Sequence, residues 1–178
     1  MNIRLVKPIN EEDFAYKAKV MSDPLSMSYN AGYDINSKNR YDYDTGVIEY
    51  PKERWGLEYL RNHSKKYYFA YIKDEDLNEY VGYCCYYLDN NEYQCGIVVE
   101  HKYRHQGYGY QGLKLLIEKA KEDGITKLYD CFEEDRGCLA MFESLGFEVS
   151  ERVVWKKFGQ DVNGVIVCLD LSKIACQK

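Results

Sequence analysis

The periodicity of the sequence changes at Glu100, and this change constrains the fold more than any other feature. Ile97-Val98-Val99 ends a short apolar run that is typical of a buried strand. A polar turn with two glycines, Gly107 and Gly109, follows it. The next apolar residues have the i, i+3, i+4, i+7 spacing of a helix with one buried face: Leu113, Leu116, Ile117 and Ala120. The chain therefore passes from a buried strand through a glycine turn into an amphipathic helix.

Strand and helix patterns surround this unit on both sides. Asp89-Asn90-Asn91 is a hairpin signal between two strand patterns, and Asn163-Gly164 is expected near the turn of a last hairpin. The expected strands cover residues 3–6, 67–72, 79–88, 92–100, 127–132, 152–158 and 165–171. The expected helices cover residues 11–21, 51–63, 109–123 and 136–145. This order predicts an α+β fold class, with one mixed, mainly antiparallel sheet flanked by helices.

The composition indicates one globular domain over residues 1–178. Hydrophobic residues make up 46% of the chain and charged residues 30%, which suits a packed core with a polar surface. No apolar run approaches the roughly 18 residues that span a bilayer, and the first ten residues lack a signal-peptide core. A net charge of −5 gives no sign of the basic face that nucleic-acid binders carry. We therefore expect a cytoplasmic protein without nucleic-acid or membrane partners.

The cysteines and histidines do not form a metal-binding pattern. Seven cysteines, at positions 84, 85, 95, 131, 138, 168 and 176, include no C-x-x-C pair. The three histidines are scattered along the chain. An odd number of cysteines without a secretory signal also argues against a disulfide framework. We expect no metal site, and most of the thiols are expected to pack as small apolar side chains.

The glycine turn itself has the features of a phosphate-binding loop. The first turn of a helix presents unpaired N–H groups and about half a positive charge. Glycine lets phosphate oxygens approach the main chain because it has no Cβ. A pyrophosphate group therefore fits the segment before the helix, and Arg104 is placed to add a charged donor at its edge.

The residues around this turn resemble the GNAT superfamily of N-acyltransferases. Arg104-His105-Gln106-Gly107-Tyr108-Gly109 matches the family motif Q/R-x-x-G-x-G/A, and Met141 to Phe147 is similar to the family's LYEKLGF ending of its fourth helix. The resemblance is strong from about residue 80 to residue 158. It implies the GNAT fold and transfer of an acetyl group from acetyl-CoA to an amine, by direct attack in a ternary complex. Either a monomer or a homodimer is compatible with it.

The resemblance also implies where acetyl-CoA binds. Main-chain groups of Ile97, Val98 and Val99 would bind the pantetheine arm as an added strand does. The main chain from Arg104 through His105, Gln106, Gly107, Tyr108 and Gly109 to Tyr110 would hold the pyrophosphate. No covalent acyl-enzyme is expected.

The catalytic residues of the family are only partly matched. A tyrosine on the fourth helix usually protonates the leaving thiolate, but Phe142 occupies that position, so Cys138 or a water molecule would have to replace it. A glutamate early in the fourth strand often serves as base; Tyr93 takes that position, with Glu92 beside it. Strand alternation places these two on opposite faces, although a bulge would change which face Glu92 sees.

The acceptor site of this fold lies mainly on the first two helices and the loop between them. Here that loop runs from residue 22 to residue 50 and is rich in tyrosine and carboxylates, including Tyr29, Tyr33 and Asp34. Aromatic faces and carboxylates suit a cationic amine, either a small molecule or a peptide N-terminus. An acidic, solvated loop whose aromatics pack on the core fits the same residues equally well.

Two other functions are compatible with parts of the sequence. Gly107-x-Gly109-x-x-Gly112, with Asp130 about 20 residues further on, is also the dinucleotide fingerprint of a Rossmann fold. That fingerprint belongs in a largely parallel sheet, whereas a hairpin precedes it here. A non-catalytic acyl-CoA-binding or regulatory protein is the second alternative, because Phe142 cannot donate a proton.

Overall fold

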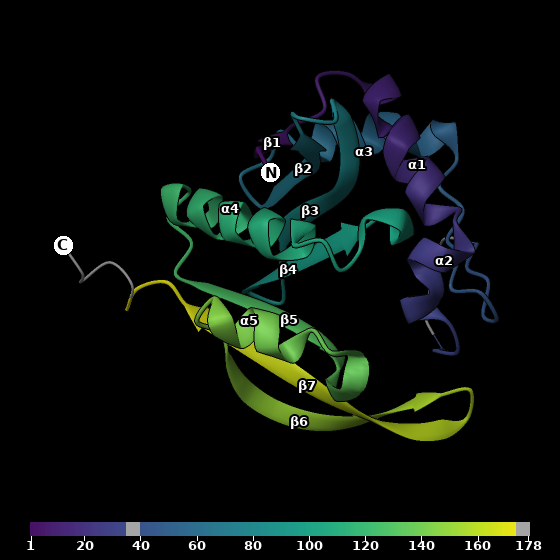
Figure 1. Cartoon of the computed structure of the whole chain (residues 1–178), viewed down its shortest axis with the longest axis vertical. Coiled ribbons are helices and arrows are strands. Elements are labelled where there is room, and N and C mark those ends of the chain that lie inside the picture. Colours follow the sequence, from purple (N-terminus) through teal and green to yellow (C-terminus); the bar gives the residue numbers. More distant parts are fainter. Residues whose placement is uncertain (35–39, 174–178) are drawn as a thin grey trace.

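A computed structural model describes residues 1–34 and 40–173. In this part of the chain seven strands form one sheet in the order β1-β2-β3-β4-β5-β7-β6 (Figure 1). Neighbouring strands are antiparallel except for β4 and β5, which are parallel. The predicted mixed, mainly antiparallel α+β fold is therefore confirmed. The strands are β1 (Ile3–Val6), β2 (Tyr67–Asp74), β3 (Glu79–Asp89), β4 (Glu92–Val99), β5 (Lys127–Glu133), β6 (Glu148–Lys157) and β7 (Gln160–Asp170).

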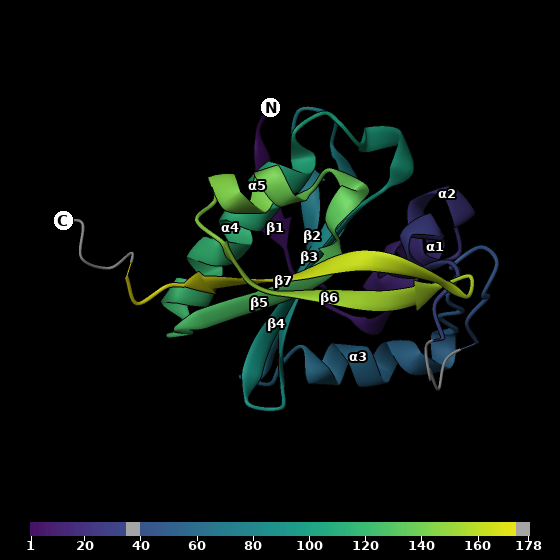
Figure 2. The same ribbon diagram turned by 90° about the horizontal axis from the view of Figure 1, so that it is seen from below.

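Helices cover both faces of the sheet (Figures 1 and 2). One face packs against α4 and α5, and its core includes Leu113, Leu116 and Phe142. The other face packs against α1, α3 and the short turn before α1, around Phe14 and Phe69. The helices are α1 (Ala15–Met21), α2 (Pro24–Met27), α3 (Trp55–Arg61), α4 (Tyr108–Glu122) and α5 (Leu139–Ser144), and single 3₁₀ turns cover Glu11–Phe14, Ser28–Asn30, Lys52–Arg54, His101–Tyr103 and Glu134–Arg136.

The hairpin turns lie at residues with a left-handed backbone. Asn90 and Asn91 have φ values of 46° and 66°, which confirms the predicted turn between β3 and β4. The prediction for the last hairpin was wrong, because its turn lies at Phe158 and Gly159, with φ values of 48° and 74°. Gly164 lies inside β7 instead. A Cβ there would come within 2.2 Å of the Trp155 ring, so this glycine accommodates a cross-strand aromatic side chain.

The sheet opens between β4 and β5. Their pairing is confined to Gln94 and Tyr129, whereas β4 continues to Val99 and β5 to Glu133. Figure 1 shows the two strands separating, with α4 on the β4 side and α5 on the β5 side. The continuing halves of both strands therefore leave main-chain edges that face one another across an opening.

The segment that was expected to be a long loop is partly helical. Asp23 caps α2 by accepting hydrogen bonds from the N–H groups of Leu25 and Ser26, and Pro24 occupies the first helical position. Residues 35–39 of this segment lie outside the described residues. No helix in the described ranges 1–34 and 40–173 is long and apolar enough to cross a membrane.

Candidate active site

The free edge of β4 carries main-chain groups that face the opening. The Glu100 N–H donates a hydrogen bond to the Val81 carbonyl at 2.9 Å. Because N–H groups alternate in direction along an antiparallel strand, this bond directs the Val98 N–H toward β3 as well. The N–H groups of Ile97 and Val99 then point toward β5, and no strand in the described part of the chain pairs with them. Of the three residues expected to contact the donor, these two therefore have available amides.

The glycine turn presents six consecutive N–H groups, those of residues 105–110. Among the described residues none of them has a hydrogen-bond acceptor. His105 and Gly107 adopt left-handed conformations, with φ values of 61° and 87°, and α4 begins directly afterwards. Successive N–H groups around left-handed residues form an anion-binding concavity, and the start of α4 adds its positive partial charge. The turn therefore has the backbone geometry of an anion-binding concavity.

Space beside the two motif glycines is open. Among the residues that the structure describes, a Cβ on Gly107 would have only the Met1 side chain within 4 Å, at 3.9 Å. A Cβ on Gly109 would meet Met141 at 3.5 Å and Val99 at 3.8 Å, which are ordinary contact distances. Neither glycine is therefore required by packing, and both leave room for a bound group. Gly107 additionally needs its left-handed backbone.

The Arg104 side chain points away from the turn. Its guanidinium donates to the carbonyl oxygens of Val99 at 3.1 Å, Leu25 at 3.3 Å and Ser26 at 2.6 Å. Burial and the nearby Arg136 lower the pKa of this guanidinium, which still remains charged. The side chain thus connects the end of β4 to α2, while its main chain begins the glycine turn.

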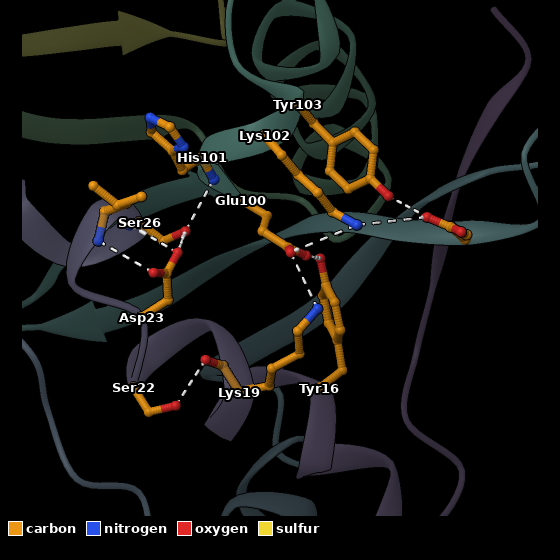
Figure 3. Close-up of polar contacts among 11 residues, drawn as sticks. Tyr16, Lys19, Ser22, Asp23, Ser26, Glu100, His101, Lys102 and Tyr103 are labelled. Atoms are coloured by element: carbon orange, nitrogen blue, oxygen red, sulfur yellow. Dashed lines mark hydrogen bonds and ion pairs between the residues drawn. The ribbon is translucent and has the colours of Figure 1, made fainter.

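Helices α1 and α2 hold the residues just before the turn (Figure 3). The His101 N–H donates to Ser26 Oγ at 2.9 Å. Glu100 is buried, and its carboxylate accepts hydrogen bonds from Tyr16 Oη at 2.9 Å and Lys19 Nζ at 3.1 Å. Burial and the Glu100 carboxylate raise the pKa of Tyr16, so the phenol remains protonated and donates. The position of the glycine turn is therefore fixed from the N-terminal helices.

A family comparison agrees with this geometry. The model of the acetyltransferase (GNAT) family matches residues 30–147, which is more than half of the 178 residues. The chain belongs to the GNAT family of acetyltransferases. The resemblance carried by Arg104 to Gly109 and Met141 to Phe147 is thereby confirmed, and the Rossmann alternative is not supported.

Solved GNAT structures share the fold at low sequence identity. The yncA protein of Salmonella typhimurium, solved with its cofactor acetyl-CoA, is 17% identical with a TM-score of 0.71, and the match covers 96% of this chain and 94% of that one. The phosphinothricin acetyltransferase of Sinorhizobium meliloti, in complex with acetyl-CoA, is 15% identical with a TM-score of 0.72. The match covers 96% of this chain and 89% of that one. A GNAT acetyltransferase of Streptococcus pneumoniae is 12% identical with a TM-score of 0.75, and the match covers 96% of this chain and 99% of that one. No curated protein matches the chain.

The two β4 candidates for a base lie near the β3–β4 hairpin turn of this GNAT chain. Glu92 is exposed and pairs with Asp89, and the β3–β4 register is continuous, without the bulge that would redirect it. Glu92 lies five residues before Ile97, about 17 Å along the strand. Tyr93 is half-buried and its ring lies edge-on to Tyr86, 6.0 Å between centroids, on the α4 side of the sheet. The structure therefore does not bring Glu92 to the opening.

The fourth-helix position of the GNAT acid is filled by a buried phenyl ring. Phe142 is 2% exposed, and its ring centroid lies 4.8 Å from Phe132 and 5.0 Å from Phe147. Cys138 precedes α5 and is partly buried; burial raises the pKa of its thiol, although the Arg136 charge opposes this. Phe142 thus contributes packing, and Cys138 is a neutral thiol near the start of α5.

The expected acceptor residues lie where the N-terminal segment meets the last hairpin. The Arg136 guanidinium lies 4.8 Å from the Tyr29 ring centroid. Tyr33 lies edge-on to Trp155 of β6, with 6.4 Å between centroids, and Lys157 Nζ lies 5.5 Å from its ring. Asp34 is exposed beside the undescribed residues 35–39. Tyr29 and Tyr33 are thus packed aromatic residues beside Arg136 and the last hairpin.

Asp130 of β5 is a candidate that the sequence analysis considered only for nucleotide binding. It is partly buried, and desolvation raises the pKa of its carboxyl to about 7, although the Cys131 N–H and Arg136 favour the charged form. The available signal was a single carboxylate inside the strand pattern of residues 127–132. The described residues contain no group of three or more His, Cys, Asp or Glu side chains that would hold a metal ion.

Proposed function

We propose that this GNAT protein transfers the acetyl group of acetyl-CoA to an amine. The observation that carries the proposal is the row of unpaired N–H groups at residues 105–110, which suits the pyrophosphate of CoA. Two of the solved GNAT structures with the same fold contain acetyl-CoA, which supports the choice of this donor. The unpaired edge of β4, with the Ile97 and Val99 amides, lies directly before the turn.

In this proposal the pantetheine arm extends along β4. The N–H groups of Ile97 and Val99 face the opening. The arm pairs with them in place of β5, which pairs with β4 only at Gln94. The Val99 carbonyl already accepts from Arg104, so the Val99 N–H and both main-chain groups of Ile97 remain for the donor. The thioester then lies toward the closed end of the opening.

The acceptor amine attacks the thioester carbonyl directly. A tetrahedral intermediate develops negative charge on oxygen, which a fixed main-chain N–H stabilises. The Ile97 N–H is the amide best placed for this, because it is the unpaired one nearest the closed end at Gln94. Tyr29 and Tyr33, which pack beside Arg136 and Trp155, supply aromatic faces for the cationic acceptor.

Donor binding is tested by calorimetric titration with acetyl-CoA. Gly107→Glu places a carboxylate in the anion site, and we expect it to abolish binding. Gly124→Glu is the matched control. Gly124 has φ +76°, has no atom of the described ranges 1–34 and 40–173 within 4 Å of its Cβ position, and lies just beyond the other end of α4. Equal loss of affinity in both variants, or normal affinity in Gly107→Glu, would remove the proposed site.

Turnover is tested by following free CoA thiol with a colorimetric reagent. Spermidine, benzylamine, an aminoglycoside and a peptide with a free N-terminus serve as acceptors. Thiol release that depends on one of these amines supports the enzyme. The buried Phe142 ring favours a second reading, a non-catalytic acyl-CoA-binding protein. Tight acetyl-CoA binding without release with any acceptor would establish that second reading and reject the proposed activity.

A further inference from the structure

Arg136 stands just beyond the end of the strand that borders the opening on its β5 side. Strand β5 ends at Glu133, and the turn Glu134–Arg136 follows it without a break. The side chain reaches toward the N-terminal segment, where its guanidinium lies 4.8 Å from the centroid of the Tyr29 ring. Tyr29 packs against the core cluster on the α1 side of the sheet. The guanidinium is therefore held on the same side of the sheet as α1.

A second guanidinium reaches the same segment from the β4 side. Arg104 follows β4 and donates to the carbonyl oxygens of Leu25 and Ser26, which lie in α2 shortly before Tyr29. Burial and the charge of Arg136 lower the pKa of Arg104, so the two like charges lie near one another. In Figure 1, β4 and β5 diverge on the side of α2. The open end of the opening thus carries one guanidinium from each strand end.

The Arg136 guanidinium is unpaired within the part of the chain that the structure describes. It donates no hydrogen bond and forms no ion pair there. The glutamates just before it pair with the last hairpin instead. Lys157 Nζ lies 2.7 Å from Glu133 Oε1, and Arg152 Nε lies 3.2 Å from Glu134 Oε1. The N–H donors of Arg136 therefore remain available for a ligand.

The remaining carboxyl groups nearby do not neutralise Arg136. Asp135 is exposed, and no ion pair joins it to Arg136 in the described ranges 1–34 and 40–173. Burial raises the pKa of Asp130 to about 7, although the Cys131 N–H and Arg136 favour its charged form. Asp130 therefore carries only part of a negative charge near neutral pH. The open end keeps an excess of positive charge, which attracts an anion.

The anionic groups of acetyl-CoA are assigned to a different place. Its pyrophosphate fits the unpaired N–H groups of residues 105–110, at the start of α4. Helix α4 packs on one face of the sheet, and Tyr29 packs with α1 on the other. The Arg136 guanidinium lies over the Tyr29 ring, and so on the side where the proposed acceptor meets aromatic faces. An anion at Arg136 therefore belongs to the acceptor.

We propose that Arg136 binds a carboxylate of the acceptor, so that the preferred substrates are amino acids and other amines with a carboxylate a few bonds from the nitrogen. This inference rests on the proposed acetyl transfer and narrows its acceptor. A guanidinium and a carboxylate form two parallel hydrogen bonds, which fix direction as well as distance. The Tyr29 ring supports one face of the guanidinium and leaves its N–H edge for the carboxylate. The amine of the same molecule then extends into the opening, toward the thioester.

The first test compares acceptors that differ only in the carboxylate. Glycine, β-alanine, γ-aminobutyrate and phenylalanine are assayed beside ethylamine, propylamine, butylamine and phenethylamine, and they extend the acceptor panel named above. A charge-assisted bidentate pair strengthens binding of the acid but not of its matched amine. We expect kcat/KM of at least one acid to exceed that of its matched amine roughly 10- to 100-fold.

The second test replaces the arginine. Arg136→Gln should raise KM for the best acid roughly 10- to 100-fold, with kcat, the constants of the matched amine and the acetyl-CoA affinity unchanged. Arg136→Lys keeps the charge without the two parallel bonds, so its KM should lie between those of the wild type and Arg136→Gln. Arg61→Gln is the control, because Arg61 is also exposed, with its guanidinium 4.2 Å from the Tyr67 ring centroid, but belongs to α3. It should keep the wild-type constants.

The possible failures are distinguishable. Wild-type activity that is equal for the acids and their matched amines, or an equal loss for both in Arg136→Gln, overturns the role of Arg136 and leaves the acetyltransferase intact. Weaker acetyl-CoA binding in Arg136→Gln assigns the arginine to the phosphates of the donor instead. Absence of thiol release from every amine, with or without a carboxylate, removes the proposed function and this inference with it.

Discussion

The Arg104 guanidinium and the Ser26 carbonyl oxygen are joined by a 2.6 Å hydrogen bond that ties the start of the glycine turn to α2. The same side chain also reaches the carbonyl oxygens of Leu25 and Val99. A residue that the sequence motif places beside a phosphate thus uses its side chain to hold the main chain in position. The contribution of the Arg104 side chain to stability can therefore be measured apart from any contribution to ligand binding.

Arg104→Lys should destabilise the protein even without a ligand. Lysine keeps the charge but has a single nitrogen, so it cannot reach three carbonyl oxygens on two segments. We expect the free energy of unfolding to fall by about 2 kcal/mol in urea denaturation without acetyl-CoA. An unchanged free energy together with weaker acetyl-CoA binding would instead assign the side chain to the donor.

Gly109→Ala should separate binding from stability. Its Cβ would sit at ordinary contact distances from Met141 and Val99, and alanine favours the helix by up to about 1 kcal/mol. We expect equal or higher thermal stability with weaker acetyl-CoA binding. Gly112→Ala should do the reverse and lose about 1–3 kcal/mol, since its Cβ would lie 2.5 Å from Ile72 Cδ1. Loss of stability in Gly109→Ala would contradict the open space beside the turn.

Phe142→Tyr should not improve catalysis. The added hydroxyl enters an aromatic cluster formed with Phe132 and Phe147, where the ring is 2% exposed. Burying an unpaired hydroxyl costs about 1–3 kcal/mol, so the variant should unfold at lower urea concentration. A higher kcat in the thiol-release assay would show that the hydroxyl reaches the leaving sulfur and that the ring position is catalytic after all.

Asp130→Asn should stabilise the protein at alkaline pH. The folded-state pKa of Asp130 is about 7, against an ordinary value of 3.8, so the native state holds a proton that the unfolded state has lost between these values. Stability from this group therefore falls as pH rises from about 4 to 7 and stays low above it. The variant should gain about 4 kcal/mol at pH 8, and the gain should shrink toward pH 4. An equal gain at both pH values would show that ionisation is not the cause.

The local sequence determined most of the elements and the glycine turn before α4. Apolar spacing from Leu113 to Ala120 was sufficient to predict α4, because one buried face needs only residues a turn apart. Gly107, Gly109 and the motif around them predicted the turn for the same local reason. The turn of the last hairpin was predicted wrongly because Asn163-Gly164 is a common turn pair. Gly164 instead lies in β7, where it makes room for the Trp155 ring on the neighbouring strand β6.

Tertiary structure alone decided which main-chain groups of β4 are left unpaired at the opening. Separation of β4 from β5 beyond Gln94 and Tyr129 depends on how distant segments pack, and no periodicity records it. That separation frees the Ile97 and Val99 amides and places Asp130 at its closed end, where burial sets its charge. Hydrogen-bond direction and desolvation depend on neighbours that are remote in sequence, so residue order could predict the family but not which amides are free or which carboxyl has a raised pKa.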